Sequence, residues 1–548
     1  MKRLIACSLA LLMLAGCATC EKPPASSHAA TVPAQTQQKN EEAAYESRFS
    51  SETRIELSDE GIKTKDLSVY ASNDIIYYED KDFYESGNPY GEGEDADKHS
   101  AEEAEKHIVV NITKPGTYRV TGKLSAGQIR VDLGEAAYDD PNAVVELILD
   151  NADITCTVAP AILFLNVYEC DGDWSEDTAK PDVDTSAAGA NLILEGSNTV
   201  NGSYVARIYK DKEGEKKLWK QDGAIYSYMS MNVYGPGALD LTAENEGMDT
   251  ELHLTIHGGT IAIRSGNDGI NTNEDNVSVT TIHGGNLHIM AGLGTEGDGI
   301  DSNGYLVING GTVISSANPA ADAGLDSSLG SFIHGGTVIA LGSTMDWAES
   351  DSEQVTMNLQ FAGFQAPTDD IRVTTEDGSE IFTYDPASDP VLGDNARRFM
   401  GAVISCPEFK QGETYLVHVG GTQMQYTGTD VRRGPGGFGE FGDMPDNAPP
   451  EGFNGQIPEG FPSEMPEGWI PGDMGEPPEG LEGFTGERPE PPEGFDGQMP
   501  QGGRGPRPEG FGGEMPERFE GTMPGEENTL FYMQDKVNCF SGITAVTE

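Results

Sequence analysis

The stretch GDGIDSNGYLVINGG, residues Gly297–Gly311, combines closely spaced glycines with an alternating apolar segment and several polar side chains. Its polar residues include Asp298, Asp301 and Asn303. Glycine adopts backbone conformations with positive φ without a steric penalty, so it suits sharp turns between short strands. The stretch therefore predicts a strand bounded by two tight corners, with carboxylates beside one of them.

The same pattern occurs four times between residues 222 and 342. A tetrad of glycine, an apolar residue, Asp or Asn, and Ser or Thr begins at Gly247, Gly269, Gly299 and Gly324. A strand that ends in a glycine pair follows each tetrad, and the pairs begin at Gly258, Gly284, Gly310 and Gly335. The segment DGAIYSY, which starts at Asp222, is a looser copy of the tetrad.

A period of about 25 residues with short strands in each unit predicts a solenoid. Leucine-rich repeats have a similar length, but their leucine pattern is missing from this sequence. The pattern fits an all-β parallel β-helix, in which each repeat forms one coil and equivalent residues stack about 4.8 Å apart. Ile300, Leu306 and Ile308 are then expected to face the apolar interior.

The N-terminal segment MKRLIACSLALLMLAGCATC resembles an export signal, because basic residues precede a short apolar run. The run ends in Leu14, Ala15, Gly16 and Cys17, which resembles the lipobox of bacterial lipoproteins. That resemblance implies cleavage before Cys17 and lipidation of this residue. An ordinary secretory signal is the alternative. We expect an extracytoplasmic protein that is anchored to the cell membrane by lipid at the cell surface.

Composition divides the rest of the chain. The C-terminal part contains strand-like pieces around a long segment rich in Pro, Gly and Glu, which is expected to be disordered. The expected segments are a signal peptide at 1–16, a flexible tether at 17–50, the β-helix at 51–342, a small C-terminal β module at 343–431, the low-complexity excursion at 432–526 and a terminal β segment at 527–548 that packs on the module.

The chain is strongly acidic, with 91 acidic against 34 basic residues and a net charge of −57. Such a charge repels nucleic acid and anionic membrane surfaces and attracts divalent cations. Nucleic acid is therefore not an expected partner, and the expected contact with the membrane is through the lipid anchor alone.

Stacking the tetrads brings polar positions into a column. Their third residues are Asp249, Asn271, Asp301 and Asp326, and Asp268 and Asp298 precede two of the glycines. Two carboxylates about 5 Å apart repel each other by roughly 3 kcal/mol at an effective dielectric constant near 20, and the repeats contain only Arg264 as a fixed cation. Bound Ca²⁺ would compensate this repulsion. The alternative is that these residues cap coil corners through hydrogen bonds, without a metal.

The sequence leaves open the roles of two further sets of residues, the histidines of the repeats and the cysteines. His257, His283, Asn309 and His334 precede the glycine pairs and form either a polar surface stripe or, because imidazoles bind metals, a transition-metal site. An exported chain also forms disulfides. Cys156 is close to Cys170 in sequence, and Cys406 and Cys539 lie in late β segments, but the connectivity does not follow from the sequence.

Several segments of the sequence, taken in order, resemble a known family. The segments GTYRVTGKLSAGQIRVD, NLILEGSNTVNG, GPGALDLTAENEGMD, GDGIDSNGYLVINGGT and GGTVIALG, followed by AVISCPEFKQGETYLVHVGG and VNCFSGIT, are similar to the carbohydrate-binding parallel β-helix proteins of anaerobic, plant-fibre-degrading bacteria. The resemblance implies a right-handed, pectate-lyase-like β-helix that binds Ca²⁺ and also binds cellulose or pectin-type polymers without cleaving them. It assigns calcium to Asp268, Asn271, Asp298, Asp301, Asn303 and Asp326. Ala323 departs from the pattern in the last coil.

The first functional hypothesis is a non-catalytic, calcium-dependent polysaccharide-binding protein. Aromatic rings that could stack on sugars are Tyr226, Tyr228, Tyr234, Tyr305, Trp219 and Trp347. Each of them is individually also a natural core or edge residue.

Two other hypotheses remain. A calcium-dependent pectate lyase needs a base such as Lys or Arg. The repeats contain no lysine, so only Lys216, Lys217 or Lys220 beside the first coil would serve. Hydrolysis by paired carboxylates is a less marked enzymatic alternative, since no residue stands out as the acid. The last hypothesis is a structural surface spacer or adhesin.

Overall fold

The computed structural model describes residues 45–78, 97–172, 174–209, 218–343, 346–430 and 528–547, which all belong to one compact unit. The expected signal peptide, Cys17, most of the tether, Lys216, Lys217 and the segment 432–526 lie outside these ranges. Within them the chain is all-β, as predicted, with only short helical pieces. These pieces are α1 (Ala101–Ala104), η3 (Glu135–Asp139), η4 (Pro386–Ser388) and η5 (Gly393–Asn395).

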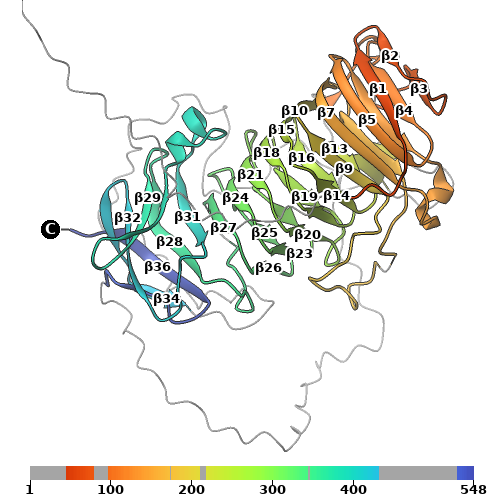
Figure 1. Ribbon diagram of the computed structural model, residues 1–548. Helices are drawn as coiled ribbons and strands as arrows, with labels where there is room; N and C mark the ends of the chain where they lie inside the picture. The colour runs from red at the N-terminus through yellow and green to blue at the C-terminus, as the bar shows by residue number, and fades with distance from the viewer. Residues whose placement is uncertain are drawn as a thin grey trace, which may run out of the picture. The chain divides into compact units, whose positions relative to one another are not determined.

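Parallel pairing between successive repeats dominates the region up to Gly342, where each strand pairs with its equivalent in the next repeat (Figure 1). Three ladders result, because a typical repeat contributes one strand to each. The first contains β7 (Val145–Thr155), β9 (Ala190–Glu195), β14 (Met231–Tyr234), β17 (Leu254–Ile256), β20 (Val279–Ile282), β23 (Tyr305–Ile308) and β26 (Gly330–Ile333). The second contains β10 (Ser197–Gly202), β15 (Ala238–Ala243), β18 (Thr260–Ser265), β21 (Asn286–Met290), β24 (Thr312–Ser316) and β27 (Thr337–Gly342).

The third ladder carries the acidic positions. It contains β4 (Ile108–Ile112), β6 (Gly127–Asp132), β8 (Ile162–Asn166), β13 (Gly223–Ser227), β16 (Glu246–Thr250) and β19 (Ile270–Thr272). A parallel bridge from Ile270 to Ile300 leads on to the short strands β22 (Asp301–Ser302) and β25 (Asp326–Ser327), which pair with each other.

The N-terminal strands extend these ladders. β1 (Glu52–Ser58) pairs in parallel with β5 (Gly116–Leu124), which pairs in parallel with β7. The remaining N-terminal pairings are antiparallel. They join β2 (Gly61–Lys63) to β1, β3 (Val69–Ser72) to β4, and β11 (Val205–Tyr209) to β12 (Leu218–Gln221).

The glycine pairs of the repeats form sharp corners. The second glycine of each pair has a positive φ, at +101° for Gly259, +93° for Gly285, +83° for Gly311 and +90° for Gly336. Any residue with a Cβ would be strained there. Ile300, Leu306 and Ile308 are fully buried in one apolar cluster that runs through the ladders, as their alternation predicts.

A second apolar core defines the C-terminal module, in which most pairings are antiparallel. Strand β31 pairs with β27, the last strand of the second ladder, and β36 pairs in parallel with β28, so the end of the chain is part of the module. Its strands are β28 (Thr356–Gln365), β29 (Ile371–Thr375), β30 (Glu380–Tyr384), β31 (Phe399–Ser405), β32 (Thr414–Val419), β33 (Thr422–Gln425), β34 (Gly428–Asp430), β35 (Phe531–Tyr532) and β36 (Val537–Ala545).

Among the described residues, the disulfides considered from the sequence are absent. The four free cysteines are Cys156, Cys170, Cys406 and Cys539. Cys156 is 1% exposed within the main apolar cluster, whereas Cys406 and Cys539 belong to different apolar clusters. The Cys539 sulfur accepts a hydrogen bond from Asn358 at 3.3 Å. These cysteines behave as small core residues because packing against apolar neighbours, rather than cross-linking, places them.

We predict that Gly269→Ala destabilises the fold. A Cβ at Gly269 would lie 2.5 Å from the carbonyl oxygen of Gly299 on the next coil and 2.2 Å from Ile289 Cγ2. Overpacking of this kind lowers the free energy of unfolding by about 1–3 kcal/mol. Urea denaturation measures the change.

Gly363→Ala is the matched control, because no heavy atom lies within 4 Å of its added Cβ. Its expected change is below about 0.5 kcal/mol. Equal effects of the two substitutions would contradict close contact between neighbouring coils at Gly269.

Candidate functional site

The strand register brings the third residues of the tetrads together. Asp249 on β16 pairs with Asn271 on β19, and Asp301 on β22 pairs with Asp326 on β25. The bridge between Ile270 and Ile300 joins the two halves. Neighbouring parallel strands lie about 4.8 Å apart, so these four positions form one column. Asn303, another residue of the predicted metal set, is near the same edge, where its amide donates to the Asn273 carbonyl at 2.9 Å.

A second column contains the residues that precede the tetrad glycines. Asp268 Oδ1 accepts a hydrogen bond from the Asp298 amide at 2.6 Å, and Asp298 Oδ1 accepts one from the Ala323 amide at 2.5 Å. These carboxylates therefore cap the corner of the following coil, which is the metal-free role considered from the sequence. The capping series ends at Ala323 because its methyl group offers no acceptor.

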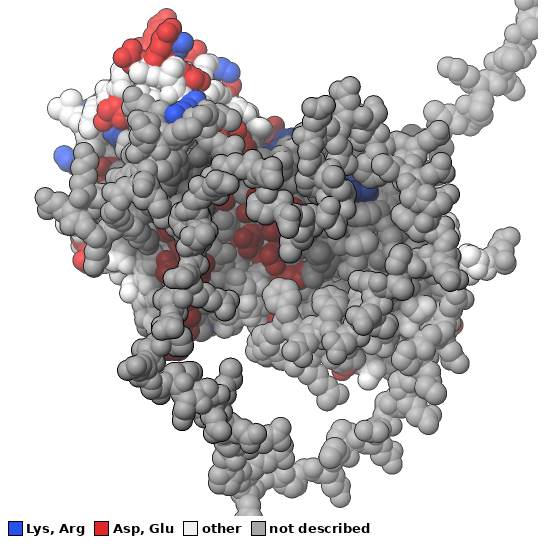
Figure 2. Space-filling model, turned by 180° about the vertical axis from the view of Figure 1, so that it is seen from behind, with Lys and Arg blue, Asp and Glu red and all other residues white. Residues whose placement is uncertain are grey.

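Three buried carboxylates, Asp222, Glu246 and Asp249, form the most compact acidic group of the described residues. One carboxylate oxygen from each lies within 4.8 Å of the others. Asp249 is fully buried, Glu246 is 3% exposed and Asp222 is 5% exposed. We call these three residues the acidic cluster. In Figure 2, Asp and Glu residues gather toward the middle of the face seen from behind.

The column expected from the sequence contained Asp249, but the six residues assigned to calcium through the family resemblance omitted all three members of the acidic cluster, although they included Asn271 beside it. Glu246 precedes Gly247 just as Asp268 and Asp298 precede their glycines. Asp222 precedes Gly223 in the looser repeat copy, whose strand β13 pairs with β16. Aligning the residue before every tetrad glycine, with Glu accepted beside Asp, would have found Glu246.

Several oxygens at the acidic cluster are buried without a hydrogen-bond partner. They are Glu246 Oε2, Asp249 Oδ2 and Asn271 Oδ1. The amide of Asn271 donates to Glu246 Oε1 at 3.2 Å, and Asn273 donates to Asp249 Oδ1 at 2.7 Å. The available donors thus satisfy one oxygen of each carboxylate and leave the other unsatisfied, at a cost of about 1–3 kcal/mol for each buried group.

A single described cation contacts the acidic cluster. Lys220 Nζ lies 2.6 Å from Asp222 Oδ2. Arg264, the fixed cation of the repeats, instead contacts Asp240 at 2.6 Å. The acidic cluster therefore has more negative charge than its described protein partners balance.

Burial and mutual repulsion raise the pKa values of the aspartates in the two columns, which favours the binding of protons or cations. Burial, followed by the charge of Glu246, raises the pKa of both Asp249 and Asp268 well above the ordinary value. Burial is also the largest cause for the next coils, where the pKa of Asp298 rises to about 8 and that of Asp301 to about 7. The pKa of Asp326 is raised for the same reason.

Two of the aromatic residues expected to contact sugar are unsuitable. Tyr226 is fully buried and Tyr228 is 5% exposed. Their rings meet edge to face with centroids 5.1 Å apart. Their hydroxyl groups bond to Glu251 and Gln221 respectively. Both tyrosines are therefore packing residues next to the acidic cluster.

The other aromatic candidates differ in burial and in packing. Tyr305 is half-buried and its ring lies 6.1 Å from that of Phe332. Trp347 packs partly buried against the main core, and Tyr234 stacks on His257. Trp219 lies on β12, but its side chain is outside the described part of the structure. These residues do not form one aromatic platform.

The histidine positions do stack. The ring planes of Tyr234 and His257 are nearly parallel, with an interplanar angle of 6° and centroids 4.3 Å apart. The ring centroids of His257 and His283 are 5.2 Å apart. The Asn309 amide nitrogen donates to His283 Nδ1 at 3.3 Å. Burial and the neighbouring His283 lower the pKa of His257 to about 4. Among the described residues, the group of side chains close enough to hold a metal ion contains none of these histidines, which favours the polar stripe over a metal site.

Comparison with known families identifies the family of this chain. Residues 106–404 match the family described as carbohydrate-binding domain-containing protein, and the chain belongs to that family. A protein of that description from Acetivibrio thermocellus is 29% identical over 157 residues, which is 28% of this chain and 45% of the relative. The chain thus spans less than half the length of that relative.

A solved structure gives a weaker likeness. It is the polysaccharide lyase-like protein from C. thermocellum, studied as a gadolinium derivative, with 21% identity, 52% coverage of this chain, 93% coverage of that chain and a TM-score of 0.30. This likeness is too slight to support an argument about fold or function. Separately, none of the described helices has the length and apolar character needed to cross a bilayer.

We predict that the metal-free protein loses stability as the pH rises from about 4 to about 8. Unfolded aspartates titrate near pKa 3.9, whereas folded Asp301 and Asp298 titrate near 7 and 8. Between these values the folded state binds more protons, so the free energy of unfolding falls with rising pH. Thermal unfolding in EDTA at pH 5, 6.5 and 8 measures this trend.

Calcium should raise the melting temperature more at pH 8 than at pH 5. At pH 8 the buried aspartates have lost their protons, and the ion compensates the charge that remains. Asp298→Asn should flatten the pH dependence measured in EDTA. A melting temperature that rises from pH 5 to pH 8 without metal would contradict the raised pKa values.

Proposed function

We propose that this protein is a lipid-anchored, extracytoplasmic protein that binds plant cell-wall polysaccharide, either cellulose or a pectin such as polygalacturonate, in a calcium-dependent manner and without cleaving it. Membership of the carbohydrate-binding domain family supports the binding of polysaccharide. The single observation that supports calcium is the group of buried, unsatisfied oxygens at the acidic cluster. The lipobox-like segment that ends at Cys17 supports the anchor.

We further propose that the three parallel ladders wrap into a right-handed parallel β-helix. In this arrangement each repeat is one coil, and the positive-φ glycines at residues 259, 285, 311 and 336 turn the chain between ladders. The continuous apolar cluster is the interior of the helix. The outer faces then form long surfaces of regular spacing, which suit an extended polymer.

Calcium fits the chemistry of the acidic columns. It takes six to eight oxygen ligands from carboxylates, amides, carbonyls and water at about 2.3–2.6 Å. Asp222, Glu246 and Asp249 supply carboxylates, and the unsatisfied Oδ1 of Asn271 supplies an amide oxygen. Asp268, Asp298, Asp301, Asn303 and Asp326 would continue the series, with part of their capacity used by corner capping.

Calcium also has a role in binding an acidic polymer. A protein with a net charge of −57 repels polygalacturonate unless a cation lies between the two. Calcium that is shared between protein carboxylates and uronates would supply that link. A neutral glucan needs no such link, so the calcium dependence of binding distinguishes the two kinds of polymer.

We predict that Asp249→Asn weakens calcium-dependent binding to pectate at least tenfold, because it removes one of three carboxylates that surround the same position. Co-sedimentation with calcium pectate and with cellulose, in calcium and in EDTA, measures binding. Asp139→Asn is the control, since Asp139 is an exposed carboxylate on η3. Equal binding by the two variants would contradict the calcium role, and no sedimentation of the wild type would favour the spacer.

A calcium-dependent polysaccharide lyase is the second candidate, because Lys220 contacts Asp222 at the acidic cluster. A lyase needs a base close to its calcium to remove the proton next to the uronate carboxylate. Lys220 supplies an amine at such a place. Its ion pair with Asp222 favours the charged ammonium, which is a poor base.

We predict no unsaturated product when the protein is incubated with polygalacturonate and calcium, as followed by ultraviolet absorbance with a known pectate lyase as positive control. Product formed by the wild type and lost in Lys220→Ala would replace the binding assignment with the lyase. Product that persists in Lys220→Ala would also overturn the non-catalytic assignment and would point to another base.

A further inference from the structure

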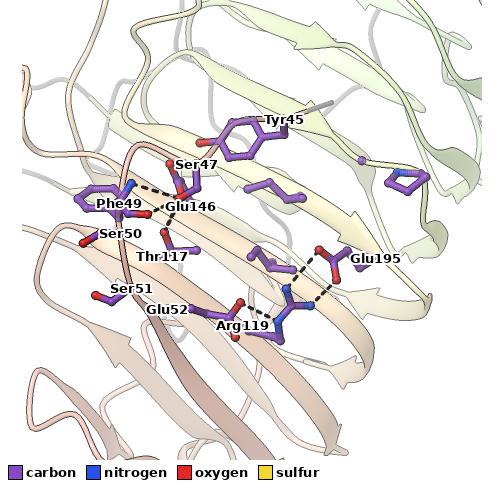
Figure 3. A pocket seen from close by; sticks show the side chains of 14 residues that line it. Tyr45, Ser47, Phe49, Ser50, Ser51, Glu52, Thr117, Arg119, Glu146 and Glu195 are labelled. Atoms are coloured by element: carbon purple, nitrogen blue, oxygen red, sulfur yellow. Dashed lines mark hydrogen bonds and ion pairs between the residues drawn. The ribbon is translucent and has the colours of Figure 1, made fainter. Parts of the chain in front are cut away.

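A cleft of about 470 Å³ lies near the N-terminal end of the ladders, apart from the acidic columns. The segment from Tyr45 to Glu52 forms one side of it, and the outward-facing residues of β5, β7 and β9 form another (Figure 3). Its volume falls within the range of about 300–1,000 Å³ that is usual for small-molecule sites. The segment 45–52 precedes the family match, which begins at residue 106, so this side of the cleft is a feature of the chain outside that match.

The N-terminal segment is fixed in place by a buried carboxylate. Glu146 is fully buried and accepts hydrogen bonds from Ser47 Oγ at 2.5 Å, from Thr117 Oγ1 at 2.5 Å and from the Arg48 amide at 2.7 Å. Burial alone would raise the pKa of Glu146, but the hydrogen bonds from Ser47 and Thr117 lower it below its ordinary value. Glu146 is thus an ionised anchor for the segment, and the cleft exists before any ligand arrives.

The cleft combines an apolar base with aromatic edges. Ile148 and Ile193 line it while exposing only 8% and 4% of their surface. Phe49 and Tyr45, both half-buried, stand at its edge, and the Tyr45 ring packs on Tyr234 at 4.6 Å. A sugar ring has an apolar face of C–H groups that packs against such surfaces, and aromatic rings provide much of that contact at little entropic cost.

A polar cluster around Arg119 lines the same cleft. Its guanidinium bonds to Glu52 at 2.9 Å and to Asp150 at 3.1 Å, and it forms a two-pronged pair with Glu195 (Figure 3). This network holds Glu52 and Glu195 in fixed positions. Arg119 engages both oxygens of Glu195 and one of Glu52, and Arg54 lies 3.2 Å from the other Glu52 oxygen. Each carboxylate oxygen has two lone pairs, so these oxygens can still accept a further hydrogen bond from a sugar hydroxyl group. Ser50 and Ser51 add exposed hydroxyl groups nearby.

The charge of the cleft selects among sugars. Two positive charges, Arg119 and Arg54, meet three negative charges, from Glu52, Asp150 and Glu195. Glu146 adds a fourth carboxylate to the lining. An acidic sugar would bring another negative charge into a partly desolvated site, which is unfavourable without a bridging cation. Neutral hydroxyl groups are favourable partners, because hydrogen bonds to ionised acceptors are about twice as strong as neutral ones.

We propose that the cleft between residues 45–52 and strands β5, β7 and β9 is a second carbohydrate site, which binds a short neutral oligosaccharide without calcium. This inference rests on the proposed carbohydrate binding but assigns it to a surface other than the acidic columns. The N-terminal segment provides the aromatic side, and the network of Arg119 provides the acceptors for hydroxyl groups.

Isothermal titration of the full chain in EDTA tests this site, with cellotriose as the neutral probe and trigalacturonate as the acidic one. The wild type should bind cellotriose and should not bind trigalacturonate under these conditions. Phe49→Ala should weaken cellotriose binding about tenfold, and Ser50→Trp should block it by filling the cleft. Phe364→Ala is the matched control, because Phe364 is a 41% exposed aromatic residue on β28.

Melting temperatures of all variants check that each one folds. Absence of cellotriose binding by the wild type, or equal affinity in Phe49→Ala, Ser50→Trp and Phe364→Ala, would overturn the second site. If calcium-dependent sedimentation with pectate persists in that case, only this inference fails. If the wild type binds neither the trisaccharides nor the insoluble polymers, the proposed function fails with it.

Discussion

The hydrogen-bonded register between equivalent parallel strands is the constraint on which the other features of this protein depend. Because Asp249 pairs with Asn271 and Asp301 pairs with Asp326, residues that are 22 and 25 positions apart in the sequence become neighbours in space. The same register aligns the apolar side chains into one core and the histidines into a stack. A shift of one residue would turn every buried side chain outward.

This register also concentrates charge, and the protein handles that charge in two ways. Asp268 and Asp298 use backbone amides of the following coil as donors, which satisfies part of each carboxylate. Glu246 and Asp249 have buried oxygens that receive no such donor. Carboxylates that close to each other and that deeply buried hold protons more tightly or attract a cation. Both arrangements occur on the same ladder, so carboxylates with backbone donors and carboxylates with unsatisfied oxygens lie along one edge.

The carboxylates of the N-terminal strands and those of the later repeats have different partners. Around Arg119 and Glu146, fixed donors satisfy the carboxylates with hydrogen bonds, and the N-terminal segment lies beside the strands. In the later coils, cations are scarce and aspartates predominate. The neutral-sugar site and the calcium site that we propose fall in these two different regions, although the backbone is the same repeated unit in both.

The sequence alone determined the local features. Glycine spacing and apolar alternation predicted the all-β repeats, the corners at glycine pairs and the interior positions of Ile300, Leu306 and Ile308, because backbone conformation and strand periodicity are short-range properties. Only the tertiary structure decided which side chains meet. It joined Asp222 to Glu246 and Asp249, buried Tyr226 and Tyr228, kept the cysteines apart and placed residues 45–52 beside Arg119. These outcomes depend on the register between coils and on how loops cover each face, and neither is encoded in the spacing within a single repeat.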